Sequence, residues 1–162
     1  MISFIKWTAL IIIIAVLQTS VLPQYLFPIY KPDLFLIFMV LLALRAPFTV
    51  SLPASYSLGL LKDCLSGIYF GLNAFSFLIV YLVIKLLSDR LYVQNAFLLV
   101  MTVSASTVAV MAINLILLTI FSESPGLFSS ILHSVIPHLL MNAFAVSLTT
   151  LFPEINRSGT AR

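Results

Sequence analysis

The sequence predicts an all-α protein that crosses a membrane several times, and three observations support this fold class. Of the 162 residues, 62% are hydrophobic and only 8% are charged, against about 25% charged in an average soluble domain. The mean hydropathy is +1.18. Apolar runs of helical length follow one another along the chain. Because so short a chain has too few polar residues to cover its surface, we expect that surface to face lipid.

Six apolar segments are expected to be transmembrane helices that form a single domain over residues 1–162. The segments are 4–22, 33–44, 48–61, 72–87, 96–121 and 127–152, with a short polar tail at 156–162. We expect Pro23 to end the first segment, and Pro32 and Asp33 to begin the second. The first run also has features of a signal peptide, but no small-x-small cleavage site follows it, so we expect it to be retained.

The second and third segments are shorter than the roughly 20 residues that span a bilayer without tilt. One long helix over 34–61 is the alternative. It would place Arg45 near the middle of the membrane, at a cost of about 2.5–3.5 kcal/mol. It would also place Pro47 inside a helix, where a backbone hydrogen bond is lost. Two short helices joined by a tight turn at 45–47 avoid both costs.

The distribution of basic residues favours six spans with both termini in the cytoplasm. This topology leaves Lys31 and Lys62 outside and places the other basic residues inside: Lys6, Arg45, Lys85, Arg90, Arg157 and Arg162. A five-span alternative with an external N-terminus splits seven loop charges five to two and leaves Arg45 in the membrane. The net charge of +3 is spread over single residues, so no nucleic-acid-binding face is expected.

Glycines and polar residues interrupt the apolar background between the third and fourth segments, at Gly59, Lys62, Asp63, Ser66, Gly67, Gly71 and Asn73. Irregular backbone at membrane depth is tolerated where it is buried in protein or lines a wet cavity. One interpretation is a binding or contact surface at the outer end of these segments. The other is an ordinary loop, in which Asp63 balances Lys62 and Ser66 is a cap. Asp33, at the same expected level, either caps the second segment or belongs to that surface.

Catalytic and metal-binding patterns do not appear in the sequence. No GxSxG, HExxH or GxxxxGK[ST] motif occurs, so no enzyme activity is expected. His138 and Asn142 share a helix face, but His133 is rotated away from them and no carboxylate or cysteine lies nearby. We therefore expect no metal and no cofactor. Asn114 and Asn142 are expected to hydrogen-bond between helices, and Pro137 to kink the last helix.

Two sequence motifs resemble those of the MreD family, the bacterial rod shape-determining membrane proteins. The first is Pro32-Asp33 at the start of the second segment. The second is Gly59-Leu60-Leu61-Lys62-Asp63-Cys64-Leu65-Ser66-Gly67 followed by Gly71-Leu72-Asn73. Length and segment layout agree along nearly the whole chain, although Ala46-Pro47 stands where the family has a glycine-containing turn. The positions that match the motifs are contact candidates without an assigned ligand: Pro32, Asp33, Gly59, Asp63, Ser66, Gly67, Gly71 and Asn73.

The resemblance implies a six-helix bundle similar to the S components of energy-coupling-factor transporters, in the bacterial inner membrane. It implies a non-catalytic scaffold for peptidoglycan biosynthesis and rod shape. The implied partners are MreC, membrane lipids, and the MreB-associated elongation complex with its glycosyltransferase and penicillin-binding transpeptidase. The small residues 104–106 are candidate helix contacts. The alternative is a substrate-binding membrane subunit of a vitamin-type transporter, with its pocket at the outer ends of segments two to four.

Overall fold

The structure, a computed structural model, describes residues 2–27, 30–67, 70–88, 96–121 and 126–150, without the side chains of 2–8, 96, 126–133 and 150. Within these ranges the regular elements are helical and none is a strand, which confirms the all-α prediction. In chain order the helices are α1 (Ile2–Val16), the π-helical η1 (Leu17–Val21), α2 (Leu22–Tyr25), α3 (Leu34–Arg45), α4 (Phe48–Ser66), α5 (Leu72–Ser88), α6 (Ala96–Phe121) and α7 (Gly126–Thr150).

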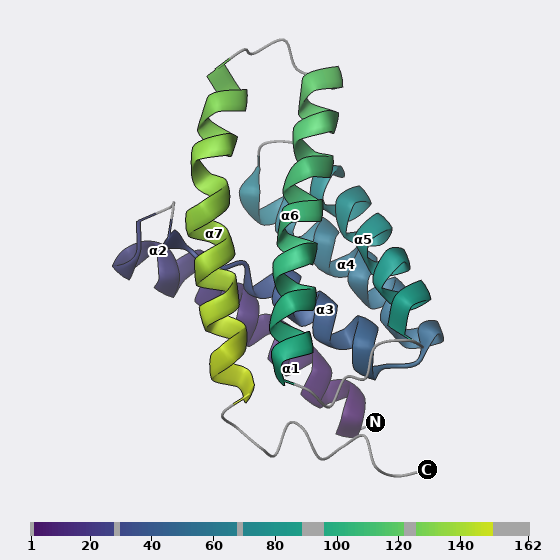
Figure 1. Cartoon of the computed structure of the whole chain (residues 1–162). Helices are drawn as coiled ribbons and strands as arrows, with labels where there is room; N and C mark the ends of the chain where they lie inside the picture. Colours follow the sequence, from purple (N-terminus) through teal and green to yellow (C-terminus); the bar gives the residue numbers. More distant parts are fainter. Residues whose placement is uncertain (1, 28–29, 68–69, 89–95, 122–125, 151–162) are drawn as a thin grey trace.

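The short helix α3 lies at the centre of the bundle. It contacts α1, α4, α5, α6 and α7, while α6 and α7 lie side by side and extend beyond it (Figure 1). Eight of its twelve residues are buried: Phe35, Leu36, Ile37, Phe38, Met39, Val40, Leu42 and Ala43. At 1.5 Å per residue α3 is about 18 Å long, well short of a bilayer core of about 30 Å.

A turn at residues 45–47 separates α3 from α4, so the chain forms two helices here and not one long helix. Ala46 is extended, with φ −98° and ψ 152°, as expected of a residue that precedes proline. The Lys85 ammonium of α5 donates hydrogen bonds to the carbonyl oxygens of Ala43 (3.2 Å) and Ala46 (2.8 Å). A cation at this end satisfies carbonyl groups and complements the dipole of α3.

The first helical segment does not end at Pro23, which corrects the expectation from the sequence. The chain passes from α1 through η1 into α2 and leaves the helical conformation at Leu26, with φ −122° and ψ 136°. Pro23 lies in the first turn of α2, where its missing N–H group costs little. The π-helical turn also changes the register of the side chains along the helix, and Gln18 within it is buried.

Helix α4 is longer than expected, because residues 62–66 continue the helix instead of forming a loop. It ends at Gly67, whose φ of +65° is left-handed and whose N–H group donates to the Asp63 carbonyl oxygen at 3.0 Å. Such a glycine is a common end to a helix, because it adopts this conformation without strain. The polar motif is therefore part of a helical hairpin.

Helix α6 is long and apolar enough to cross a membrane by itself. Its segment Phe97–Phe121 has 25 residues and a mean hydropathy of 2.1, and only 22% of its most apolar stretch is buried within the protein. The other apolar helical segments are shorter, at Ala9–Tyr25, Leu34–Arg45, Leu72–Ser88 and Ser134–Thr149. α7 continues through Pro137. The membrane crossing of the shorter helices and the kink at Pro137 stay predictions.

Candidate functional site

The N-terminus of α3 is the first polar centre of the molecule. Pro32 is buried, and the Asp33 side chain accepts a hydrogen bond from the Leu36 N–H group at 3.1 Å through Oδ1. This contact is that of an N-cap, which satisfies an otherwise unpaired backbone donor of the first turn. The capping interpretation of Asp33 is confirmed.

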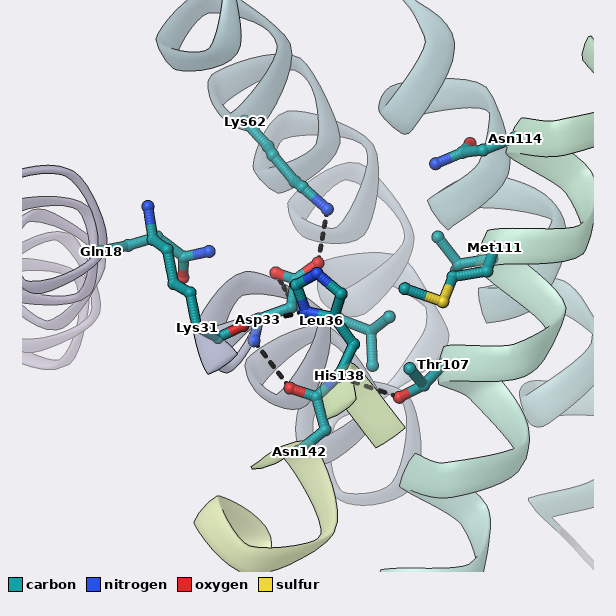
Figure 2. A pocket seen from close by; sticks show the side chains of 11 residues that line it. Gln18, Lys31, Asp33, Leu36, Lys62, Thr107, Met111, Asn114, His138 and Asn142 are labelled. Carbon is teal, nitrogen blue, oxygen red and sulfur yellow. Dashed lines mark hydrogen bonds and ion pairs between the residues drawn. The ribbon is translucent and has the colours of Figure 1, made fainter. Parts of the chain in front are cut away.

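Side chains from distant elements bind the remaining polar groups at this end of α3. Gln18 Oε1 accepts a hydrogen bond from the Leu34 N–H group at 2.8 Å, and Asn142 Oδ1 accepts one from the Asp33 N–H group at 2.6 Å. His138 Nδ1 lies 3.0 Å from the Lys31 carbonyl oxygen, so Nδ1 carries the proton that it donates. Figure 2 shows these side chains converging from η1 and α7 on one point. The start of α3 is thus fixed by tertiary contacts.

Asn142 also connects α7 to α6, because its Nδ2 donates to Thr107 Oγ1 at 3.0 Å. The Asn142 side chain is 1% exposed, so both ends of its amide are used inside the protein. The expectation that this residue hydrogen-bonds between helices is confirmed. A single side chain therefore joins α3, α6 and α7.

Lys62 pairs with Asp33 and not with its neighbour Asp63. The Lys62 ammonium contacts Asp33 Oδ2 across α4 and α3, and lies 5.2 Å from the centre of the Phe77 ring. Successive residues of a helix point in different directions, which is why Lys62 and Asp63 enter separate sites. The loop interpretation, with Asp63 balancing Lys62, is wrong in this respect.

Asp63 is the second polar centre and joins α4 to α5. Its carboxylate is 2% exposed. Oδ1 accepts hydrogen bonds from the backbone N–H of Asn73 (3.0 Å) and from its side-chain Nδ2 (2.8 Å). Oδ2 accepts from the backbone N–H groups of Gly71 and Ala74, each at 3.0 Å. Asp63 therefore accepts hydrogen bonds from the backbone N–H groups at the start of α5, which have no partner within the helix. The helix dipole also favours an anion at this position.

The remaining motif residues serve the same hairpin. Gly71 has a φ of +94°, a conformation that glycine adopts readily. A Cβ atom on Gly59 would lie 2.5 Å from the Ala74 Cα atom, so the absence of a side chain lets α4 and α5 approach closely. The Ser66 hydroxyl donates to the Asp63 carbonyl oxygen at 3.1 Å. The structure thus gives Gly59, Asp63, Ser66, Gly67 and Gly71 local structural roles.

A chain of side-chain amides continues from Asp63 into α6. Asn114 Nδ2 donates to Asn73 Oδ1 at 3.4 Å, and the Ser76 hydroxyl donates to Asn114 Oδ1. The expectation that Asn114 hydrogen-bonds between helices is confirmed. These contacts join α5 to α6 and, through Asp63, to α4, because an amide in an apolar surrounding needs a partner.

A cavity of about 270 Å³ lies beside the first polar centre, at the start of α3. Its lining combines charged and polar side chains from η1, the loop before α3, α4, α6 and α7 with a few apolar ones: Gln18, Lys31, Asp33, Leu36, Lys62, Thr107, Val110, Met111, Asn114, His138 and Asn142. Figure 2 shows these side chains around the start of α3. The cavity is thus a partly open one that gathers polar side chains of an otherwise apolar bundle.

Of the eight positions that match the family motifs, Asp33 is the one among the cavity's lining residues, and Lys62 of the polar stretch joins it there. The sequence did not predict that Gln18, Lys31 and Thr107 line a site. Gln18 and Thr107 are polar residues within apolar helices, and such residues tend to face the interior of a bundle and to have partners there. That tendency was the one available signal, and it does not reveal which residues meet. The side chain of His133 lies outside the described residues.

The described residues form a small, apolar helical bundle with two polar centres at the starts of α3 and α5. The family described as "rod shape-determining protein MreD" matches residues 1–155. The chain belongs to the MreD family, as its motifs predicted, and so has a role in rod shape determination and is a membrane protein. Comparisons with curated proteins and with solved structures found no match.

Proposed function

We propose that the chain is a membrane scaffold of the bacterial cell-wall elongation machinery, which maintains rod shape by binding MreC and the peptidoglycan synthases. The observation that carries this proposal is the family match over residues 1–155. The internal contacts agree with it, because the motif residues hold helices together and present no arrangement of nucleophile and base. The chain acts by position and contact, without catalysis.

The proposed architecture is a single domain of six membrane-crossing helices in the inner membrane, with both termini in the cytoplasm and a bundle similar to S components of energy-coupling-factor transporters. The charge pattern supports this topology. Arg45 and Lys85 lie at the C-terminal end of α3, whereas Lys62 contacts its N-terminal end. Basic side chains at the first end suit the cytoplasmic face. In this proposed topology the cavity is toward the outer face.

The partner surface that we propose is the exposed face of α6. Large apolar side chains project from it at helical spacing: Phe97, Met101, Val108, Ile116 and Ile120. Ala105 and Ala112 are exposed on the same face, whereas Ser106 is buried in the bundle. Small residues let a second transmembrane helix approach closely. Of the candidate stretch 104–106, Ala105 is therefore the position that a partner helix such as that of MreC would contact.

The second candidate function is a substrate-binding subunit of a small-molecule transporter, and the cavity beside Asp33 favours it. Its volume of about 270 Å³ is just below the roughly 300–1,000 Å³ of pockets that enclose a drug-sized ligand. A vitamin-sized substrate would therefore need the helices to separate. Rescue of vitamin uptake in a transport-deficient strain by this chain would support that function over the scaffold.

Depletion of the chain in a rod-shaped host tests the scaffold. We expect round cells and loss of the normal distribution of MreC along the cell, because the scaffold no longer positions MreC. Wild-type chain should restore rods and should carry MreC with it through affinity purification from detergent-solubilised membranes. The substitution Ala105→Leu, which fills the point of close approach, should lower the amount of MreC recovered.

The matched control is Val108→Leu, which enlarges an exposed side chain on the same face without filling a small-residue site. It should recover MreC as the wild type does. Unchanged rods and normal MreC localisation after depletion would contradict the scaffold. Equal recovery of MreC with Ala105→Leu would instead move the contact away from this face of α6.

A further inference from the structure

The cavity beside the start of α3 carries an excess of positive charge. Lys31 and Lys62 contribute two ammonium groups and Asp33 the one carboxylate among its lining residues, which leaves a formal charge of +1 with His138 neutral. Both oxygens of that carboxylate are already in use: Oδ1 accepts from the Leu36 N–H group and Oδ2 contacts Lys62. The excess charge is therefore located on Lys31.

Lys31 lies in the loop before α3 and forms no ion pair within the part of the chain that the structure describes. Among the described residues, none accepts a hydrogen bond from its ammonium group. Partial burial lowers the pKa of Lys31 below its ordinary value. The Asp33 carboxylate opposes this change, and the nearby Lys62 adds to it. A half-buried ammonium beside a second cation is stabilised by any anion that reaches it.

Gln18 supplies a neutral donor at the same place. Its Oε1 accepts a hydrogen bond from the Leu34 N–H group, and this contact fixes the orientation of the amide. The Nε2 group has no acceptor among the described residues. The side chain is 8% exposed and lines the cavity. Gln18 and Lys31 both line this cavity (Figure 2). An amide donor and an ammonium thus face the same space.

We propose that this cavity binds a phosphate group, through Lys31 and Gln18 on one side and Lys62 on the other. A phosphate has acceptor oxygens on several sides, which suits donors that arrive from η1, the loop before α3 and α4. Lysine ammonium groups bind phosphate well as point charges. The volume of about 270 Å³ accommodates a headgroup more readily than a drug-sized molecule.

The phosphate has two possible sources, a lipid headgroup or a free anion, and the experiment distinguishes them. The full-length chain is purified in a neutral detergent, and apparent dissociation constants are obtained from the shift of its melting temperature. One series adds inorganic phosphate against chloride at constant ionic strength. The other uses nanodiscs that contain increasing fractions of phosphatidic acid in phosphatidylcholine. A response to phosphatidic acid alone identifies a lipid headgroup, and a response to both probes identifies a phosphate site open to free anions.

Three variants connect the response to the cavity. Lys31→Gln should raise the apparent dissociation constant about tenfold or more, as expected for the loss of one charged hydrogen bond. Asp33→Asn keeps a residue that caps helices well and removes the competing carboxylate, so it should lower the constant. Arg45→Gln removes the same charge from an exposed position at the opposite end of α3, and should leave it unchanged.

Two results would overturn the proposal. The first is a wild-type chain that responds to neither inorganic phosphate nor phosphatidic acid beyond chloride or phosphatidylcholine. The second is an equal loss of affinity in Lys31→Gln and Arg45→Gln, which would mean that the anion follows overall charge and not this cavity. Neither result would bear on the binding of MreC, so the proposed scaffold function is tested independently of this site.

Discussion

Asp63→Ala is expected to lower the free energy of unfolding by about 3 kcal/mol or more, because four donors, three of them in buried hydrogen bonds, lose their acceptor side chain. Asp63→Asn should be nearly as damaging. Each carboxylate oxygen accepts two hydrogen bonds, so an amide in either orientation turns its NH₂ group toward two other donors. Asp63→Asn also removes the negative charge that the N-terminus of α5 favours. Thermal unfolding of the purified chain in detergent measures both effects.

The matched control for Asp63 is Ser66→Ala, one turn further along α4. Ser66 is exposed, and its hydroxyl donates a single hydrogen bond to the Asp63 carbonyl oxygen. The Ser66→Ala substitution should change the free energy of unfolding by less than about 0.5 kcal/mol, as surface substitutions usually do. An Asp63→Ala chain that melts at the wild-type temperature would show that this carboxylate does not hold α4 to α5.

Gly59→Ala should destabilise the chain by about 2 kcal/mol, although alanine is by itself the better helix former. The added Cβ atom would lie 2.5 Å from the Ala74 Cα atom, 2.8 Å from its nitrogen and 2.9 Å from the Asn73 carbonyl oxygen. These are backbone atoms, so no rotation of a side chain relieves the contact and the two helices must separate. Overpacking of this kind costs roughly 1–3 kcal/mol.

Separation of α4 from α5 also draws Asp63 away from its donors, so the two sites are expected to be coupled. In a double-mutant cycle, Gly59→Ala combined with Asp63→Ala should cost less than the sum of the single changes. Ser57→Thr, which adds one methyl group at an exposed position of α4, is the control for volume and should be nearly neutral. Full additivity of the two changes would contradict a shared hairpin.

The helices were largely predictable from the sequence, because apolar runs and prolines are local signals. The turn at 45–47 was anticipated from Arg45 and Pro47. Two helix boundaries were not predicted, the end of the first helical segment and the end of α4. Pro23 lies in a first turn, where proline is tolerated, because a π-helical stretch precedes it. Residues 62–66 are helical because Gly67 ends α4 and Asp63 has buried partners in α5, and those partners are not visible in local sequence.

The sequence predicted that Asp33 and Asp63 belong to polar sites, but it did not predict which residues pair with them. The motif drew attention to Asp33 and Asp63, and both are held by hydrogen bonds at helix N-termini. Their partners come from far along the chain: Asn142 is 109 residues from Asp33, and Lys62 is 29 residues from it. Such pairings depend on how helices pack, and helix packing has no periodic signature in a single sequence. For the same reason the cavity and the role of Gln18 could not be predicted.

We propose that the helices cross the membrane with α4 running from the cytoplasmic face to the outer face, and that the cavity lies at the outer face. Cys64, the one cysteine of the chain, is exposed in the last turn of α4, and Ala46 lies just before its first residue. A membrane-impermeant maleimide applied to intact spheroplasts should label Cys64. It should label Ala46→Cys, in a Cys64→Ser background, only after the membrane is permeabilised. Labelling of both positions from the same side, or of Ala46→Cys alone from outside, would contradict the account.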